Sequence, residues 1–509
     1  MTYLERLHAQ ISVELYRCTQ LLTGEIAAWQ ALSDTDENRY GIHKSQIREI
    51  KDMLANFNIE EQQLYPSLGN ATDATSLARA ASAIAAVQLK VQAVAAIFRH
   101  MLAQRTDLGM PVIAATGDSR PGAGEQSPQH PILRQYAVAL DHADLISADC
   151  YTTWTERAVN RGLLKPDAVR VPPLTYFVAE AGPGVATRKI SKLSSLGFPL
   201  VAAHRDLDLP VSVIALPFAF TLAFSSYCSI YHEVGHLLIH DLKLKERFLT
   251  PLAEALGTNK AGSVRARDWE DWRVEIVADA IGVLLGGAGF AYFMMDILFN
   301  TPAVFSQPGA HSKRHPIPYI RVFLIAALLR ELQVEVGSFA EEADNLEARC
   351  RELYGEPQQL QAYLGDCQVV AQVLLNTPIR DQEDKEDKED KEENPTRLRD
   401  FAPHLENDTY LADRLANFLV TGTDRPHPAQ QGITFRHVPV ATRLAIEKVT
   451  EHSEQTYKGI HETLLEYCRY IPRPSYLSHE EQAENRREFM RRLVHNFIFA
   501  AREDNDDVE

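Results

Sequence analysis

The pattern of apolar and polar residues predicts helices over most of this chain. Near the start, Leu4, Leu7 and Ile11 recur at the spacing that places side chains on one face of a helix. Helical stretches of this kind continue to about residue 108, and connected amphipathic helices pack as antiparallel bundles. The pattern therefore predicts a helical bundle at residues 1–108, followed by a loop at 109–132 that is rich in Gly, Pro and Ser.

The middle of the chain combines helices with a few short strands. A helix is predicted at about 133–160. After it, short runs of β-branched and aromatic residues, bounded by Pro and Gly, predict strands at 169–171, 175–178 and 211–215. The run 211–216 is the candidate for an exposed edge strand to which an extended peptide could add, and a plain structural strand is the alternative. Further helices are predicted at about 268–299, 317–334 and 338–376, with a polar loop or lid at 241–266.

A charged, repetitive run separates this middle part from the end of the chain. Glu-Asp-Lys occurs three times within 381–393, and charge of this density cannot build a hydrophobic core. It predicts an acidic, low-complexity linker at 377–395, followed by a helical C-terminal domain at 396–509. Two histidines of that domain, His427 and His437, are predicted to lie on its surface.

Composition narrows the class of protein. With 509 residues, of which 45% are hydrophobic, the chain can bury a sizeable core. A net charge of −17 argues against nucleic acid as a partner. Six cysteines without paired spacing are typical of reduced thiols in a cytosol. The sequence has no leader-like start and no run of eighteen apolar residues, so we expect a cytoplasmic protein without a membrane span.

One short stretch carries candidate chemistry. His232-Glu233-Val234-Gly235-His236 contains the pattern H-E-x-x-H among largely apolar neighbours. Two histidines four positions apart lie one above the other on a helix, so both imidazoles can reach one tetrahedral Zn²⁺ at about 2.0–2.1 Å. Glu233 can then take a proton from a water that the metal activates. The stretch predicts a zinc site with its own general base.

A catalytic zinc site needs a third protein ligand and one open position. Glu275 and Asp279 lie four residues apart among apolar neighbours, so they share a helix face. One of them can bind the metal while the other orients a ligand histidine. His240 is the competing candidate, but on a straight helix it lies about 12 Å along the axis from His232, too far to share one ion. We interpret His240 as a histidine at the end of the helix.

The H-E-x-x-H stretch followed by Glu275 and Asp279 resembles the gluzincin metallopeptidases, the thermolysin-like group. The resemblance covers about residues 210–330, and it extends to bacterial regulatory proteases and to phage-exclusion proteases of the Lit type. It implies that Glu275 is the third zinc ligand and that Asp279 holds His232 in place.

A third fragment, His315-Pro-Ile-Pro-Tyr319-Ile-Arg321, resembles the His-Pro segment that follows the metal-binding helices of several such enzymes. The resemblance implies that His315 or Tyr319 stabilises the oxyanion that forms on the scissile carbonyl. It also implies that Arg321 pairs with a carboxylate of the site. A helix start without chemistry is the alternative.

These patterns together predict a mainly helical α+β protein, in which a zincin-like peptidase core with a small sheet occupies 133–376 between helical N- and C-terminal domains. We expect one Zn²⁺ per chain and a zinc-dependent endopeptidase that cleaves a selected protein in a regulatory or defence role. The alternative is a zinc-stabilised sensor or scaffold without turnover, which binds protein partners through its helical flanks.

Overall fold

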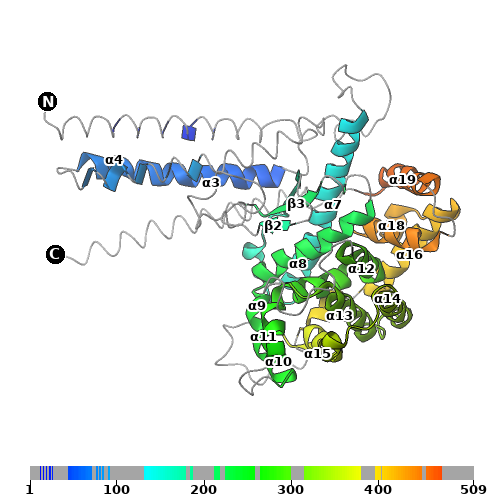
Figure 1. The fold of residues 1–509 in the computed structure, drawn as a ribbon. Coiled ribbons are helices and arrows are strands. Elements are labelled where there is room, and N and C mark those ends of the chain that lie inside the picture. Colours follow the sequence, from blue (N-terminus) through cyan, green and yellow to red (C-terminus); the bar gives the residue numbers. More distant parts are fainter. Residues whose placement is uncertain are drawn as a thin grey trace, which may run out of the picture.

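The structure is a computed structural model. It describes residues 44–70, 131–178, 184–186, 211–217, 224–257, 264–299, 315–379, 396–402, 404–449 and 454–472, together with Phe220 and single positions between 12 and 26 and between 76 and 91. Over these residues the protein is mainly helical and has one small sheet (Figure 1). The prediction of a mainly helical α+β fold is confirmed at this level.

The described elements run in the following order. The first are α3 (Lys44–Gln62), α4 (Leu64–Gly69), α7 (Pro131–Asn160), β1 (Leu174–Val178), β2 (Gly184–Ala186), β3 (Val213–Pro217) and α8 (Ser229–Asp241). Then come α9 (Leu244–Arg247), α10 (Leu249–Ala255), α11 (Val264–Asp271), α12 (Arg273–Phe299), α13 (Pro318–Glu331), α14 (Phe339–Tyr354) and α15 (Gln361–Asn376). The last are α16 (Leu405–Thr421), α17 (Pro428–Gln431), α18 (His437–Lys448) and α19 (Glu454–Cys468). Short 3-10 helices include η2 (Pro166–Ala168), η6 (Phe224–Cys228) and η10 (Leu398–Phe401).

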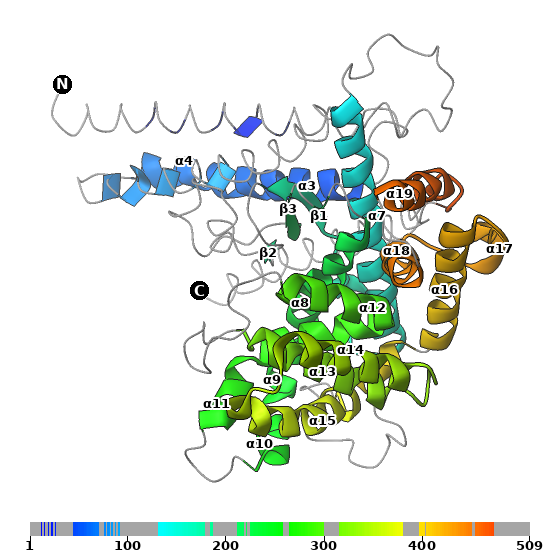
Figure 2. The same ribbon diagram turned by 45° about the vertical axis from the view of Figure 1, so that its right-hand side comes forward.

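Two helices, α8 and α12, lie side by side at the centre of the body (Figures 1 and 2). Every residue of α12 from Glu275 to Met295 is buried, because α8, α13 and α18 each pack against a different part of its surface. Among the described helices, only α12 has the length and composition to cross a membrane, over Arg273–Leu298, and the most apolar 18-residue window of that stretch is wholly buried inside the protein. The all-round apolar sequence of α12 therefore reflects its central position in the core.

The sheet has three described strands in the order β1-β3-β2. The middle strand, β3, pairs in parallel with β1 and antiparallel with β2. The prediction of an edge strand at 211–216 is therefore wrong, because both sides of this run are already paired. The three residues of β2 were not predicted, since Gly-Val-Ala is too short to show an alternating pattern. Among the described strands β2 lies at an edge, next to α8.

Three other local predictions differ from the structure. Residues 169–171 do not form a strand, because two prolines follow them directly and proline has no amide hydrogen for a ladder. The described part of 241–266 contains short helices instead of a loop. The predicted helix at 338–376 is two helices, because the chain turns at Gly355, whose φ of 71° suits glycine best.

The residues on either side of the acidic run are paired with each other. Pro378 and Arg397 form an antiparallel bridge, and the amide of Ile379 donates a hydrogen bond of 2.7 Å to the carbonyl of Thr396. Helices before and after the run contribute to one continuous hydrophobic core, and α18 packs against both α12 and η6. In its described part, the segment predicted as a separate C-terminal domain therefore shares the core of the predicted peptidase domain.

The helices α3 and α4 extend to one side of the body (Figure 2). Ile50, Leu54 and Phe57 of α3 are buried at helical spacing, and the hydroxyls of Thr19 and Tyr65 lie 2.7 Å apart. The helical bundle predicted at 1–108 stays a prediction, because most of its other residues lie outside the described ones. Residues 473–509 of the predicted C-terminal domain lie outside the described residues, as does most of the loop predicted at 109–132.

Candidate metal centre

The two histidines of α8 aim the same ring nitrogen at one point. The other faces of α8 are covered by the core, with Ile230, Val234 and Leu238 fully buried, so the helix cannot rotate without exposing them. His232 and His236 lie one turn apart on the face toward α12. Their Nε2 atoms are 3.0 Å apart.

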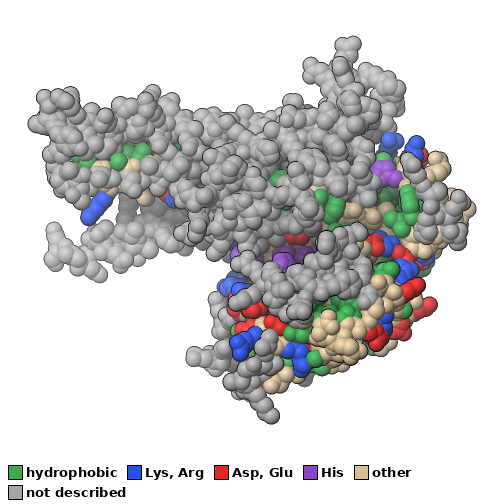
Figure 3. All heavy atoms as spheres, viewed as in Figure 1, with side chains coloured by type: hydrophobic (Ala, Val, Ile, Leu, Met, Phe, Trp, Pro, Cys, Tyr) green, Lys and Arg blue, Asp and Glu red, His purple; other side chains and the backbone are tan. Residues whose placement is uncertain are grey.

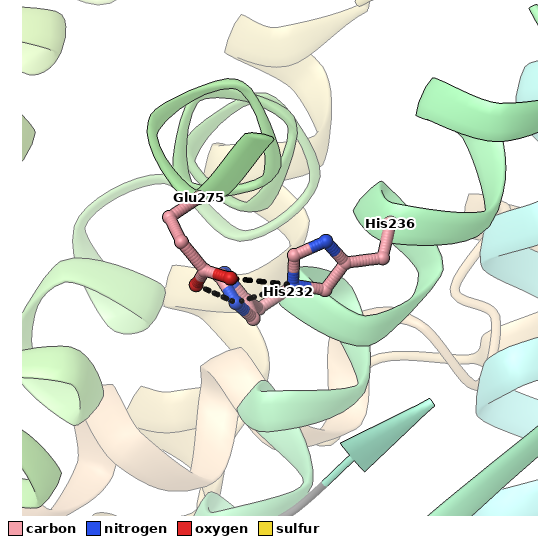
Figure 4. Close-up of side chains that lie close together, drawn as sticks. All are labelled: His232, His236 and Glu275. Atoms are coloured by element: carbon pink, nitrogen blue, oxygen red, sulfur yellow. Dashed lines mark hydrogen bonds and ion pairs between the residues drawn. The ribbon is translucent and has the colours of Figure 1, made fainter. Parts of the chain in front are cut away.

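Glu275 completes the group from α12. Its Oε2 lies 3.3 Å from Nε2 of His232, and its Oε1 lies 3.6 Å from Nε2 of His236 (Figure 4). Donor atoms held about 2.0–2.1 Å from a tetrahedral zinc ion lie about 3.3 Å from one another. The two contacts of Glu275 use different oxygens, and each of the three separations, 3.0, 3.3 and 3.6 Å, is close to this spacing. Two imidazoles and one carboxylate are also a donor set that suits Zn²⁺.

A glycine between the two histidines allows α8 and α12 to approach closely. A Cβ atom on Gly235 would lie 3.0 Å from both the Cα and the carbonyl oxygen of Ala278. Because Ala278 lies between Glu275 and Asp279 on α12, this contact sets how far the two acids reach toward the histidines. This role of Gly235 was not predicted from the sequence, where its signal is a glycine in the interior of a helix, a position at which glycine otherwise costs stability.

Asp279 and Arg321 form a buried support behind His232. Nδ1 of His232 lies 2.8 Å from Oδ1 of Asp279. Arg321 of α13 donates from Nη2 to that same oxygen at 2.6 Å and from Nε to Oδ2 at 2.8 Å. A carboxylate at Nδ1 favours the tautomer that leaves the Nε2 lone pair free for a metal. The structure thus places both residues where the sequence analysis expected them.

Asp279 and Glu275 favour a positive charge at His232. Burial alone would lower the pKa of His232, but the hydrogen bond and charge of Asp279, with a smaller contribution from Glu275, raise it to about 10. Burial would raise the pKa of Glu275, but contacts with His232 and His315 lower it instead. A proton or a metal ion can supply the positive charge that these carboxylates favour.

Glu233 lies in the buried part of the site, beside His232 on α8. It is 4% exposed. Burial raises its pKa to about 7, and the negative charge of Glu275 acts in the same direction, while His232 and Arg321 oppose it. A carboxyl group that exchanges its proton near neutral pH is suited to both accepting and donating one.

His315 lies at the exposed side of the group. Its Nδ1 is 3.2 Å from Oε2 of Glu275, and its side chain is 55% exposed. In the space-filling view, histidine and acidic side chains are visible next to one another on the surface (Figure 3). The structure therefore brings His315 to the candidate ligands at a place that solvent can reach.

Tyr319, the other candidate for oxyanion stabilisation, has its hydroxyl engaged elsewhere. It donates a hydrogen bond of 2.8 Å to the carbonyl of Gly355, and its ring stacks on Phe323 at 4.9 Å between centroids. No contact among the described residues joins it to His232, His236 or Glu275. The structure thus brings His315 to the group and does not bring Tyr319 there.

Three other histidines that the structure describes, His240, His427 and His437, do not belong to the group. His240 is half exposed and pairs with Asp241 at 3.1 Å, as expected for a histidine at the end of the helix. His427 is exposed. His437 is 3% exposed and contacts Asp408 at 3.2 Å, so the prediction of a surface position was wrong for it. Its neighbours in sequence, Val438 and Val440, are apolar and carry it into the core.

Comparisons of the chain with known protein families, curated proteins and solved structures found no match. The assignment of a function therefore depends on the geometry of this site and on the motif that the chain carries.

Proposed function

We propose that this protein is a zinc-dependent peptidase of the gluzincin type, in which His232, His236 and Glu275 hold one metal ion. The observation that supports this most is the convergence of these three side chains, with contacts of 3.0, 3.3 and 3.6 Å between them. A second observation is the buried carboxyl group of Glu233, next to the ligand His232 in α8, whose pKa is raised by burial. Zn²⁺ in such a site supplies a Lewis acid for a carbonyl and lowers the pKa of a water molecule.

The other side chains of the site have separate roles in peptide hydrolysis. Glu233 accepts a proton from the attacking water at its carboxylate and then donates that proton to the leaving amine. Asp279 holds Nδ1 of His232, and Arg321 holds both oxygens of Asp279, so the first ligand keeps one tautomer and one orientation. Glu233 and Asp279 are both buried, which keeps bulk water away from the group that transfers the proton and from the carboxylate that holds His232.

A peptide is the substrate that the surroundings favour. The described edge strand β2 lies next to α8, and an extended peptide can add to a sheet edge through main-chain hydrogen bonds. This edge replaces the one predicted at 211–216. The net charge of −17 disfavours a polyanionic substrate such as nucleic acid. We therefore propose a protein substrate, cleaved in the cytoplasm by a selective enzyme.

The first test is the metal content of the purified protein. About one zinc per chain is expected in wild type and in Glu233→Gln, and none in the double variant His232→Ala, His236→Ala. The matched control is His240→Ala with His427→Ala, which removes two exposed histidines and should keep the metal. Wild type that binds no zinc even when zinc is added would refute the proposal.

The second test separates an enzyme from a scaffold. Glu233→Gln keeps the three ligands but has no carboxylate to accept a proton, so it should bind substrate without cleaving it. Proteins captured by Glu233→Gln are incubated with wild type, and a new N-terminus in one of them is expected. Capture of the same proteins by both forms, without cleavage by either, would favour the zinc-stabilised scaffold.

A further inference from the structure

The segment that precedes and opens α13 contacts both acids of α12. At one end, Nδ1 of His315 lies 3.2 Å from Oε2 of Glu275. At the other end, Arg321 donates two hydrogen bonds, of 2.6 and 2.8 Å, to Asp279. Glu275 and Asp279 are one helical turn apart, so the segment 315–321 spans the same face of α12 that meets the histidines.

The local structure of this segment separates its two contact points. Ile317 is extended, with φ −58° and ψ 135°, and α13 begins at Pro318, a residue whose fixed φ suits the first position of a helix. Pro316 and Ile317 are buried, which anchors the extended part. His315 therefore lies before the helix and Arg321 within its first turn, each facing a different acid.

Between these points the segment is tied to another helix. Tyr319 donates to the carbonyl of Gly355, which follows the end of α14, at 2.8 Å, and α13 packs along both α14 and α15. Arg351 of α14 also lies over the ring of Phe323, at 4.9 Å. The segment is thus fixed by the core on its far side, and it can hold α12 in place instead of following it.

We propose that residues 315–321 form a clamp that sets the affinity of the site for its metal, with His315 as a positioning residue for Glu275. This inference rests on the metal site of the proposed function. Oε2 of Glu275 lies between His315 and His232, at 3.2 and 3.3 Å, which leaves Oε1 directed at His236. His315 thereby fixes the rotation of the carboxylate that completes the group of three candidate ligands.

His315 acts here through Glu275 and is not a fourth ligand. Among the described residues, the set of donor atoms that lie within 4.8 Å of one another comprises His232, His236 and Glu275 and does not include His315. Contacts that orient a ligand typically change metal affinity by about 10- to 100-fold when they are removed.

The test compares two substitutions at the same position. His315→Ala removes the contact with Glu275, whereas His315→Asn keeps an N–H group near the place of Nδ1. His240→Ala is the matched control, because it removes another histidine that is about half exposed and pairs with an acid. Zinc affinity is measured by competition with a chelator, ligand geometry from the visible absorption of the Co²⁺ form, and folding from the thermal midpoint of the metal-free protein.

His315→Ala should bind zinc about 10- to 100-fold more weakly than wild type and should have an altered Co²⁺ spectrum. His315→Asn and the control should resemble wild type, and the metal-free proteins should melt together because the side chain is largely exposed. Unchanged affinity in His315→Ala, or an equal loss in His315→Asn, would overturn the clamp while the metal site stands. Absence of metal binding in wild type would instead overturn the proposed function, and the clamp with it.

Discussion

Substitution of alanine for Gly235 tests whether the close approach of α8 and α12 determines the geometry of the candidate metal site. The new Cβ would lie 3.0 Å from the Cα and the carbonyl oxygen of Ala278. Both are backbone atoms, so no side chain can rotate away. Relief to 3.4 Å, where ordinary contact begins, needs a separation of about 0.4 Å between the helices.

The expected effect on folding is small, and the effect on metal binding is larger. Overpacking of a core costs about 1–3 kcal/mol, but alanine is favoured over glycine inside a helix by about 1 kcal/mol. Gly235→Ala should therefore lower the free energy of unfolding by about 0–2 kcal/mol. A displacement of about 0.4 Å exceeds the tolerance of about 0.2 Å in metal–ligand distances, so zinc affinity should fall by about tenfold or more.

Urea unfolding of the metal-free protein and competition of a chelator for zinc measure the two effects separately. Gly365→Ala is the matched control, because Gly365 is an exposed glycine of α15 with nothing within 4 Å of its Cβ position. It should gain about 0.5–1 kcal/mol of stability and bind zinc as wild type does. If Gly235→Ala bound zinc with unchanged affinity, the helix spacing would not determine the geometry of the site.

Three further predictions follow from other contacts. Arg321→Leu leaves the fully buried Asp279 without its bidentate partner, so the free energy of unfolding in urea should fall by about 3–5 kcal/mol. Deletion of 381–393 should change that free energy by less than about 2 kcal/mol and leave zinc binding intact, because the residues on either side are already paired and the entropy of closing the connection depends weakly on its length. A large loss would mean that the acidic run contributes to the core. Burial raises the pKa of Asp408, but its hydrogen bond with His437 and nearby arginines lower it below the usual value. That stability is present above the unfolded pKa of about 3.9 and lost as the pH falls through the folded pKa, so wild type should lose more stability than Asp408→Asn below about pH 4.

The predictions for Arg321 and Asp408 each have a further test. Lys458→Met removes a side chain whose pair with Glu462 is largely exposed, so the free energy of unfolding should change by less than about 1 kcal/mol, in contrast to Arg321→Leu. For Asp408, parallel acid-unfolding curves of wild type and variant would show that the carboxylate contributes no pH-dependent stability.

The local parts of the fold were predictable where a pattern was long enough. The helices α7 and α13 repeat a helical pattern over many residues, and the structure has them near their predicted bounds. The strand β2 has only three residues, and its pairing with β3 joins segments that are distant in sequence. Such pairings decide which strand is central and which is at an edge, and periodicity along one strand contains no information about them.

The candidate site also has one part that the sequence predicts and another part that depends on how the helices pack. The spacing of His232 and His236, and that of Glu275 and Asp279, follows from the period of a helix, so the sequence alone places each pair on one face. The contacts between these pairs depend on how α8 crosses α12, which Gly235 determines through the backbone of Ala278.

The position of α13 decides which of His315 and Tyr319 contacts the candidate ligands. His315 and Tyr319 are four residues apart in one motif and were equivalent candidates in the sequence. One reaches Glu275 while the other donates to Gly355, because Ile317 is extended and turns the chain between them. The motif therefore predicted which residue types lie near the candidate ligands, and the packing of α8, α12 and α13 decides which of these residues contact them.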